Sequence, residues 1–380
     1  MAILQKKQKK SQYYDIQNQI IPLMEGDNTI KYALIFGERS AGKSTSACMY
    51  CIKQYVEKGI QTAFIRRFDD DWGQNVANTY FNLLVSLGYI SKITKGEWDN
   101  VYYYGHRWYF CRYDNDNEKL IKAEEPFAYA YALNTWEKTK ATQQPNIKLA
   151  VLEEFISRVY IGAENTEFNC FVNLISTLAR NSEDFKVFLL GNSIAKYGNP
   201  YFICMGIEDR VLKMKQGEIV VFEKENSKLK IVVEYTKPNE DGKKSDILFE
   251  FDNTAANQVT TGEWQLEQYY PILPLGTRIK PKDIIFNYFI IYKNHILQAD
   301  IILQDKKYYT FIHRKTTEIK NEDTDLIYDL EYHLEHNYKR DLLNPVDDLT
   351  KKVAAFYKND SVYVQDPEIG EILHAYISCL

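Results

Sequence analysis

Residues 35–45 constrain the possible fold more than any other stretch of the chain. They read Ile-Phe-Gly-Glu-Arg-Ser-Ala-Gly-Lys-Ser-Thr and contain the pattern G-x-x-x-x-G-K-[ST] of a phosphate-binding loop. The pattern has this meaning only between a strand and a helix. Residues 32–36 are apolar, as in a buried parallel strand, and residues 45–57 can form a helix. The sequence therefore predicts an α/β fold with a phosphate site at one edge of its sheet.

The residues of this loop have separate expected roles. Gly37 and Gly42 let the backbone turn its N–H groups towards phosphate oxygens, and the following helix adds its dipole. Lys43 is expected to reach the β- and γ-phosphates, and the Ser44 hydroxyl to coordinate Mg²⁺. The other residues of the candidate nucleotide-binding loop are Glu38, Arg39, Ser40, Ala41 and Thr45. Because the sequence has no Asn-Lys-x-Asp guanine motif, the expected nucleotide is ATP.

A second signal lies about 110 residues after Lys43, where an apolar run ends in Glu153 and Glu154. In P-loop ATPases such a strand is expected beside the P-loop strand. Its first carboxylate holds the Mg²⁺ shell, and its second polarises the attacking water. Glu153 stands where Asp is usual, and the extra methylene moves its carboxylate ~1.5 Å outwards. The sequence therefore predicts Glu153 as a metal ligand and Glu154 as a catalytic residue.

Four further polar residues follow expected strands and helices. Arg66 and Arg67 end a second apolar strand, where ligands bind in an open α/β sheet, although a solvated rim would give the same pattern. Asn192 follows a later apolar strand and either contacts the γ-phosphate or forms a turn. Arg180 ends a helix, where it either stabilises the helix dipole or reaches a neighbouring subunit's nucleotide. For Arg180 the residues alone favour the first interpretation.

The composition is that of a globular chain of 380 residues, 45% hydrophobic and 26% charged, with a formal net charge of −5. A nucleic-acid-binding protein of this charge must concentrate its lysines and arginines locally. No apolar run approaches 18 residues, so no membrane span is expected. Cys48 and Cys51 form a C-x-x-C, but no second pair completes a zinc site, which favours core packing in a reduced, intracellular protein.

The chain is expected to divide into 1–27, an N-terminal arm, 28–207, a P-loop ATPase domain, 208–275, a small linker or insert with short strands at 215–234 and 245–252, and 276–380, a C-terminal domain. A single helix is predicted over 75–87, with its apolar residues on one face. In the C-terminal domain, three strand-like runs with tight polar turns precede a helix, a strand and a helix. This order is typical of an RNase H-like fold.

One ordered set of motifs runs through the first half of the chain. It consists of the P-loop with Arg39 in third place, Arg66-Arg67, Leu133-Asn134-Thr135-Trp136, Glu153-Glu154-Phe155-Ile156, Arg180-Asn181, and Asn192 followed by Asn199-Pro200-Tyr201-Phe202. The set resembles the DNA-packaging ATPases, or encapsidation proteins, of small short-tailed phages whose linear genomes carry a covalent terminal protein. The family pattern has Asp-Glu where this chain has Glu153-Glu154.

The resemblance implies an additional-strand (ASCE-type) P-loop ATPase joined to a vestigial RNase H-like domain. ATP hydrolysis with Mg²⁺ would drive double-stranded DNA through the portal into a preformed capsid. The resemblance also implies a homo-oligomeric ring, commonly of five subunits, at the portal vertex in the host cytoplasm; some members dock through a structural RNA. It makes Lys43, Glu154 and Arg180 the catalytic residues, with Arg180 acting in trans, and Asn192 the link between the site and motion.

Two other functions stay open. The first is a terminase-type motor that also cuts DNA, because related large terminases do so in this domain with clustered carboxylates that hold two metals. Here the first strand of the C-terminal domain has no acid and Asp300 is alone on the second, so no nuclease activity is expected. Basic residues of the domain would instead contact DNA or the portal, among them Lys306, Lys307, Arg314 and Lys315. The second alternative is a non-motor P-loop protein that uses nucleotide as an assembly switch.

Overall fold

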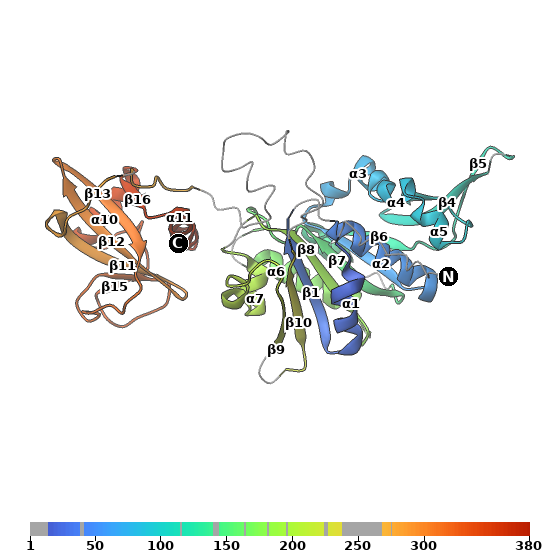
Figure 1. Cartoon of the computed structure of the whole chain (residues 1–380), viewed down its shortest axis with the longest axis horizontal. Helices are drawn as coiled ribbons and strands as arrows, with labels where there is room; N and C mark the ends of the chain where they lie inside the picture. The colour runs from blue at the N-terminus through green and yellow to red at the C-terminus, as the bar shows by residue number, and fades with distance from the viewer. Residues whose placement is uncertain are drawn as a thin grey trace, which may run out of the picture. The chain divides into compact units, whose positions relative to one another are not determined.

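The computed structural model describes residues 14–38, 42–114, 116–139, 144–162, 165–180, 182–194, 197–223, 227–237, 268–274 and 276–380. They form two compact units, one within 1–195 and 199–265 and the other within 196–198 and 266–380 (Figure 1). Within these described ranges no helix is both long and apolar enough to cross a membrane.

A sheet of ten strands forms the centre of the first unit. Its strands are β1 (Ile30–Gly37), β2 (Gln61–Arg66), β3 (Asn100–Tyr104), β4 (Arg107–Asp114), β5 (Lys119–Lys122), β6 (Ala128–Ala132), β7 (Ile147–Glu153), β8 (Lys186–Asn192), β9 (Ile219–Glu223) and β10 (Lys230–Tyr235). Their order is β3-β4-β6-β2-β7-β8-β1-β10-β9, with β5 paired to β4. The six strands from β6 to β10 along this order are parallel, so their carboxyl ends meet at one edge.

Strand β8 lies between the P-loop strand β1 and the acidic strand β7, and pairs with both in parallel. The expectation that β7 lies beside β1 is therefore wrong. The intervening strand is the additional strand of the ASCE class, which confirms the predicted fold class. It also brings the end of β8 between the P-loop and the two glutamates.

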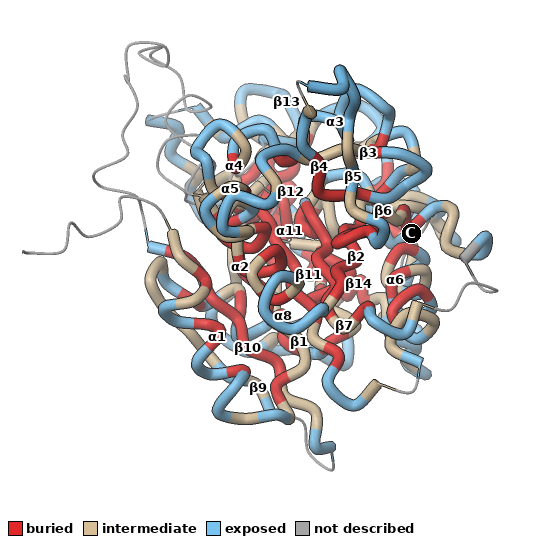
Figure 2. The backbone as a smooth tube through the Cα atoms, turned by 90° about the vertical axis from the view of Figure 1, so that its right-hand side faces the viewer, coloured by how far each residue is buried: buried red, intermediate tan, exposed pale blue. Residues whose placement is uncertain are grey.

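Helices cover both faces of this sheet because residues alternate between the faces along each strand. On β1, Ala33 and Ile35 enter one core and Leu34 and Phe36 enter the other. The first core is covered by α1 (Ile16–Gly26), α2 (Lys43–Lys58), α4 (Asn82–Ser86) and α5 (Tyr89–Ile93). The second is covered by α6 (Thr166–Leu178), α7 (Pro200–Met205) and α8 (Glu208–Val211). Figure 2 shows the buried residues following the central strands.

Two short helices replace the single helix predicted over 75–87. They are α3 (Gln74–Thr79) and α4, and the helix is interrupted at Tyr80 and Phe81. Both aromatic side chains pack on Phe64, with ring centroids 5.4 and 5.6 Å away. Consecutive residues do not share a face of a regular helix, so the helix gives way to this packing. Two 3₁₀ segments, η1 (Asp69–Trp72) and η2 (Leu133–Thr139), complete the unit.

The expected linker at 208–275 begins inside the first unit. Strand β10 pairs in parallel with β1, and β9 pairs with β10, so the sheet continues to residue 235. The strand predicted at 245–252 lies outside the described residues. At the other end, α1 belongs to the same core as α2 and is joined to it by a hydrogen bond from Ile16 N to Ser46 Oγ of 2.8 Å.

The second unit has a six-stranded sheet in the order β15-β14-β11-β12-β13-β16. Its elements are η4 (Pro281–Asp283), β11 (Ile284–Tyr292), β12 (His295–Gln304), β13 (Lys307–Arg314), β14 (Ile327–Asp329), β15 (Tyr338–Lys339), α10 (Asp348–Lys358), β16 (Val362–Val364) and α11 (Pro367–Ile377). The first three long strands are antiparallel, and β14 and β15 add in parallel beside β11. This is the strand order of the RNase H-like fold, and the predicted meander and helix–strand–helix are confirmed.

Candidate nucleotide site

The described residue at the start of α2 has the backbone conformation expected where a phosphate-binding loop enters its helix. Gly42 precedes α2 in the left-handed region, with φ of 93°, where any side chain would be strained. Helix α2 is 16 residues long and contributes its full dipole at this end. Ser44 is exposed and Thr45 half-buried in its first turn. The candidate residues Arg39, Ser40 and Ala41 lie outside the described residues.

Lys43 extends into this loop and is buried. Its Nζ donates to the carbonyl oxygens of Glu38 at 2.5 Å and Gly37 at 3.5 Å, and to Asn192 Oδ1 at 3.4 Å. Burial lowers the pKa of Lys43 to about 8, although the charges of Glu38 and Glu234 oppose that shift. Lys43 and Asn192 therefore lie close together, because Gly37 and Asn192 are register partners at the ends of β1 and β8.

Glu153 ends β7 and is buried between a cation and a phenol. Its Oε2 accepts hydrogen bonds from Arg66 Nη2 at 3.0 Å and Nε at 3.2 Å, and its Oε1 accepts one from Tyr80 at 2.8 Å. The Arg66 guanidinium also lies 4.6 Å from the centroid of the Trp72 ring. Arg66 is thus neither a solvated rim residue nor a free ligand-binding group; it neutralises the first of the two glutamates.

Glu154 is exposed and has an unusual backbone. Its φ is +55°, a left-handed conformation that costs a non-glycine residue about 1 kcal/mol or more. Its carbonyl oxygen accepts a hydrogen bond of 3.1 Å from Arg67 Nη2. Adjacent carboxylates therefore differ sharply: Glu153 is enclosed and paired, whereas the side chain of Glu154 is open to solvent.

Arg180 follows α6 in an exposed turn. Its side chain makes no hydrogen bond or ion pair with any other residue that the structure describes. The structure therefore does not bring Arg180 together with Lys43 or Glu154 of its own chain. Cys48 and Cys51 are buried in α2 and belong to the hydrophobic core.

Two site residues were not predicted from the sequence. Tyr80 falls within the helix predicted over 75–87, where it counts among the apolar residues of one face. Glu234 lies in β10, within the stretch assigned to a linker, and is buried beside Lys43, where it accepts a 2.6 Å hydrogen bond from Tyr14. The sequence feature that could have identified Glu234 is a single acid in the apolar run Ile-Val-Val-Glu-Tyr, because a charged residue in a buried strand requires a partner.

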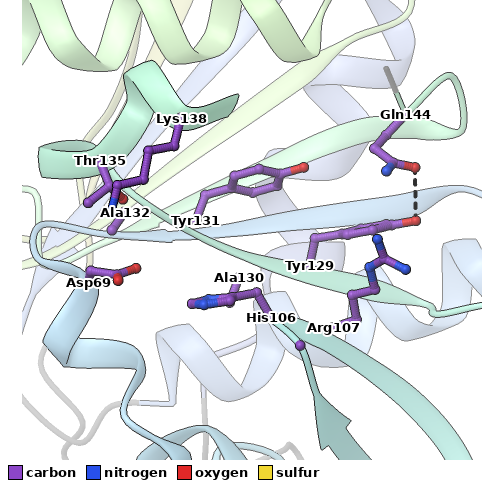
Figure 3. Close-up of a pocket in the computed structure, with 11 residues that line it drawn as sticks. Asp69, His106, Arg107, Tyr129, Ala130, Tyr131, Ala132, Thr135, Lys138 and Gln144 are labelled. Atoms are coloured by element: carbon purple, nitrogen blue, oxygen red, sulfur yellow. Dashed lines mark hydrogen bonds between the residues drawn. The ribbon is translucent and has the colours of Figure 1, made fainter. Parts of the chain in front are cut away.

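A separate cavity of about 280 Å³ lies against β6 and the turn between β3 and β4. Figure 3 shows Tyr129 and Tyr131 side by side, with Arg107 near the first ring. Tyr129 donates a 3.0 Å hydrogen bond to Gln144. None of the residues predicted for the nucleotide site lines this cavity.

The strand order and the glycine-lysine loop define the first unit as a P-loop ATPase domain of the additional-strand class. Residues 8–227 match the model of the podovirus DNA encapsidation protein (Gp16) family, and the chain belongs to that family.

Individual relatives agree with this assignment. The DNA packaging proteins of Bacillus phages phi29 and PZA are each 24% identical over 208 residues, which is 54% of this chain and 53% of theirs. The matched stretch thus spans about half the length of these relatives. In structure, the chain is similar to a protein of the bacteriophage phi29 genome packaging motor assembly. That match has a TM-score of 0.54 and 17% identity, and it covers 96% of this chain and 98% of the other.

Proposed function

We propose that this chain is a subunit of an ATP-driven motor that moves double-stranded DNA through a portal into a preformed viral capsid. The observation that carries the proposal is the convergence of Lys43, Asn192, Glu153 and Glu154 at one sheet edge. These residues come from α2, β8, β7 and the loop after β7, and such an arrangement is what phosphoryl transfer requires. Membership of the encapsidation family supplies the DNA substrate.

Lys43 and Ser44 fit a bound ATP with Mg²⁺. Among the described residues, buried Lys43 donates to carbonyl and amide oxygens, and anionic phosphate oxygens would bind its ammonium more strongly. Mg²⁺, when bound, would neutralise charge on the β- and γ-phosphates. The exposed Ser44 hydroxyl is available to it. Glu153 can act as a ligand only if Arg66 or Tyr80 gives up one of its oxygens.

The remaining roles follow from exposure and position. The open Glu154 carboxylate orients the attacking water and accepts its proton, while Lys43 offsets the charge that develops on the phosphates. Asn192 connects Lys43 to β8 and so couples the site to the sheet. The exposed Arg180 acts on the nucleotide of the adjacent subunit in a ring, commonly a pentamer, at the capsid portal in the host cytoplasm, with or without a structural RNA.

The second unit is proposed to have no nuclease activity. Asp300 is opposite Asn287, and Asp329 is opposite Ile291, on the two sides of β11. These β11 positions are four residues apart, about 13 Å along the strand, whereas two catalytic metals lie about 4 Å apart. The described residues contain no group of three or more His, Cys, Asp or Glu that could hold a metal. The unit would instead contact DNA or the portal, through basic residues such as Lys306, Lys307, Arg314 and Lys315.

Steady-state ATP hydrolysis with and without double-stranded DNA tests the motor proposal. We expect turnover by the wild type, stimulation by DNA, and no turnover by Lys43→Ala. Nucleotide-dependent assembly without turnover would favour the assembly switch instead.

A mixing experiment tests the role of Arg180. Arg180→Ala subunits lack the finger but keep an intact site, and Glu154→Gln subunits have the reverse defect. Mixed rings should therefore recover part of the activity. No recovery at any ratio would contradict a role in trans.

A further inference from the structure

A buried ion pair contacts the backbone of the loop that carries Glu154. Arg67, just after β2, pairs with Glu167 in the first turn of α6, with Nε–Oε2 of 2.6 Å and Nη2–Oε1 of 2.9 Å. The Glu167 side chain is fully buried and that of Arg67 is 10% exposed. The sequence suggested a ligand-binding or solvated arginine at this position, and the structure shows neither.

Every oxygen of Glu167 is used. Oε1 also accepts a 2.9 Å hydrogen bond from the Tyr201 hydroxyl, and Oε2 accepts one of 2.9 Å from Ile161 N. The same Nη2 of Arg67 that contacts Glu167 donates to the carbonyl oxygen of Glu154 at 3.1 Å. The pair is therefore joined at one end to the backbone of Glu154 and at the other to α6 and α7.

The rest of the 155–161 segment is held by the same group of residues. The Tyr160 hydroxyl accepts from Ser157 N at 3.0 Å and from Asn199 Nδ2 at 3.1 Å. The Arg67 guanidinium lies 5.3 Å from the centroid of the Tyr160 ring. Asn199 itself caps α7 through its Oδ1. The segment after Glu154 is thus held at Ser157, Tyr160 and Ile161 by partly buried polar contacts.

We propose that Arg67 and Glu167 are positioning residues for Glu154, holding its backbone in the left-handed turn that aims the side chain at the nucleotide. A φ of +55° costs a non-glycine residue about 1 kcal/mol or more, and the contacts of Arg67 compensate for that cost at Glu154. The hydrogen bond from Arg67 to the Glu154 carbonyl is the direct constraint. The inference rests on the proposed role of Glu154 in hydrolysis.

A positioning role has a specific kinetic signature. Neither residue is expected to contact the nucleotide, so loss of the pair should leave nucleotide binding unchanged. The orientation of the attacking water would be lost, and a misplacement of about 1 Å can lower a rate about 10²-fold. The change should therefore appear in kcat and leave KM for ATP unaltered. If the pair only stabilised the fold, its loss would instead lower ATP hydrolysis in proportion to the fraction of protein that remains folded.

Glu167→Gln is the central test, because it removes the charge and keeps the shape. We expect kcat for ATP to fall by about 10-fold to 10²-fold, with KM and the affinity for a fluorescent ADP analogue unchanged. Arg67→Lys keeps the charge but loses the bidentate fork, so it should reduce kcat similarly. The matched control is Glu218→Gln, whose partner Arg210 lies 3.5 Å away on the surface of the same unit; its kcat should stay at the wild-type value.

The outcomes separate the alternatives. If Glu167→Gln is folded at the assay temperature, as judged by circular dichroism, and its kcat equals that of the wild type, the inference is wrong. If it does not fold, Tyr201→Phe, which removes one hydrogen bond to Glu167, should still lower kcat by about twofold to fivefold. A wild-type kcat for that variant would overturn the inference. In Glu154→Ala protein, adding Glu167→Gln should lower the residual rate no further, and an additive loss would contradict action through Glu154. No turnover by the wild type would overturn the proposed function and this inference together.

Discussion

The acidic residues of the two sheets have different surroundings. In the first unit Glu153 lies near the edge where Lys43 and Asn192 meet, with groups supplied by several elements. In the second unit Asp300 and Asp329 lie on separate strands, and each is bound by one histidine, at 3.1 and 2.9 Å respectively. Carboxylates that lie beside a nucleotide-binding loop can act on a ligand, whereas separate carboxylates, each paired with its own histidine, mainly satisfy buried polar groups.

Glu154→Gln should produce the largest change in the first unit. It removes the proposed base and leaves the phosphate loop intact, so ATP hydrolysis should fall by about 10²-fold or more while nucleotide affinity is retained. Phosphate release and binding of a fluorescent ATP analogue measure the two quantities. Asp329→Asn, in the second unit, is the control. An unchanged rate for Glu154→Gln would show that Glu154 contributes no more to ATP hydrolysis than Asp329 of the second unit.

Arg66→Met should destabilise the first unit, because it leaves Glu153 buried without its cation. We expect the free energy of unfolding to fall by about 3 kcal/mol. Lys148→Met is the control: its ion pair with Asp184 is exposed, at 3.9 Å, and should contribute less than about 1 kcal/mol. Tryptophan fluorescence in urea follows this unit, since residues 268–380 contain no tryptophan. Equal losses for the two variants would show that burial of Glu153 has no energetic consequence.

Nucleotide affinity should depend on pH through Lys43. The pKa of Lys43 is lowered to about 8 by burial, so the free protein loses this charge as the pH rises from 7 to 9. ATP binds the ammonium form, and its affinity should fall about tenfold over that range. Without nucleotide, the stability of the folded protein changes with pH in the opposite direction to the ATP affinity. The unfolded chain holds this proton more strongly, so Lys43 makes the folded state more stable as pH rises from about 8 towards 10.5.

Measurements with a fluorescent nucleotide at both pH values test this expectation. Lys43→Arg keeps its charge throughout and should show no such loss of affinity. The same pH dependence in Lys43→Arg would assign the titration to another group.

The smallest effects are expected in the second unit. Asp300→Asn and Asp329→Asn should leave ATP hydrolysis unchanged, and neither wild type nor variants should cleave linear or circular DNA with Mg²⁺ or Mn²⁺. Gel electrophoresis of the DNA is sufficient. Cleavage by the wild type that disappears in Asp329→Asn would show that the second sheet also holds a catalytic site.

The parts of the fold that could be predicted depend on local signals. The phosphate loop lies between a strand and a helix that are adjacent in the chain, and its glycine and lysine pattern is recognisable without any distant contact. The three long strands of the second unit follow from alternation and tight turns. Strands β14 and β15, of three and two residues, carry too short a pattern to be recognised.

The contacts within the candidate site are non-local, which is why the sequence did not reveal them. Glu153 meets Tyr80 and Arg66 across 73 and 87 residues, and Arg67 meets Glu167 across 100. Each of these residues has an ordinary alternative explanation when considered alone: an apolar helix face, a rim arginine, or an acid in a first helical turn. Only the order of the strands brings them together.

Helix α6 has a mechanical consequence. Glu167 lies in its first turn, tied to the loop of Glu154, and Arg180 lies just beyond its last turn. Its 13 residues span about 20 Å, and Phe171, Leu174 and Ile175 pack it against the sheet. An element this short tilts as a rigid rod, so a small shift at one end becomes a displacement at the other. In the proposed ring, each subunit would thereby transmit the state of its own catalytic loop as a change in the reach of its arginine.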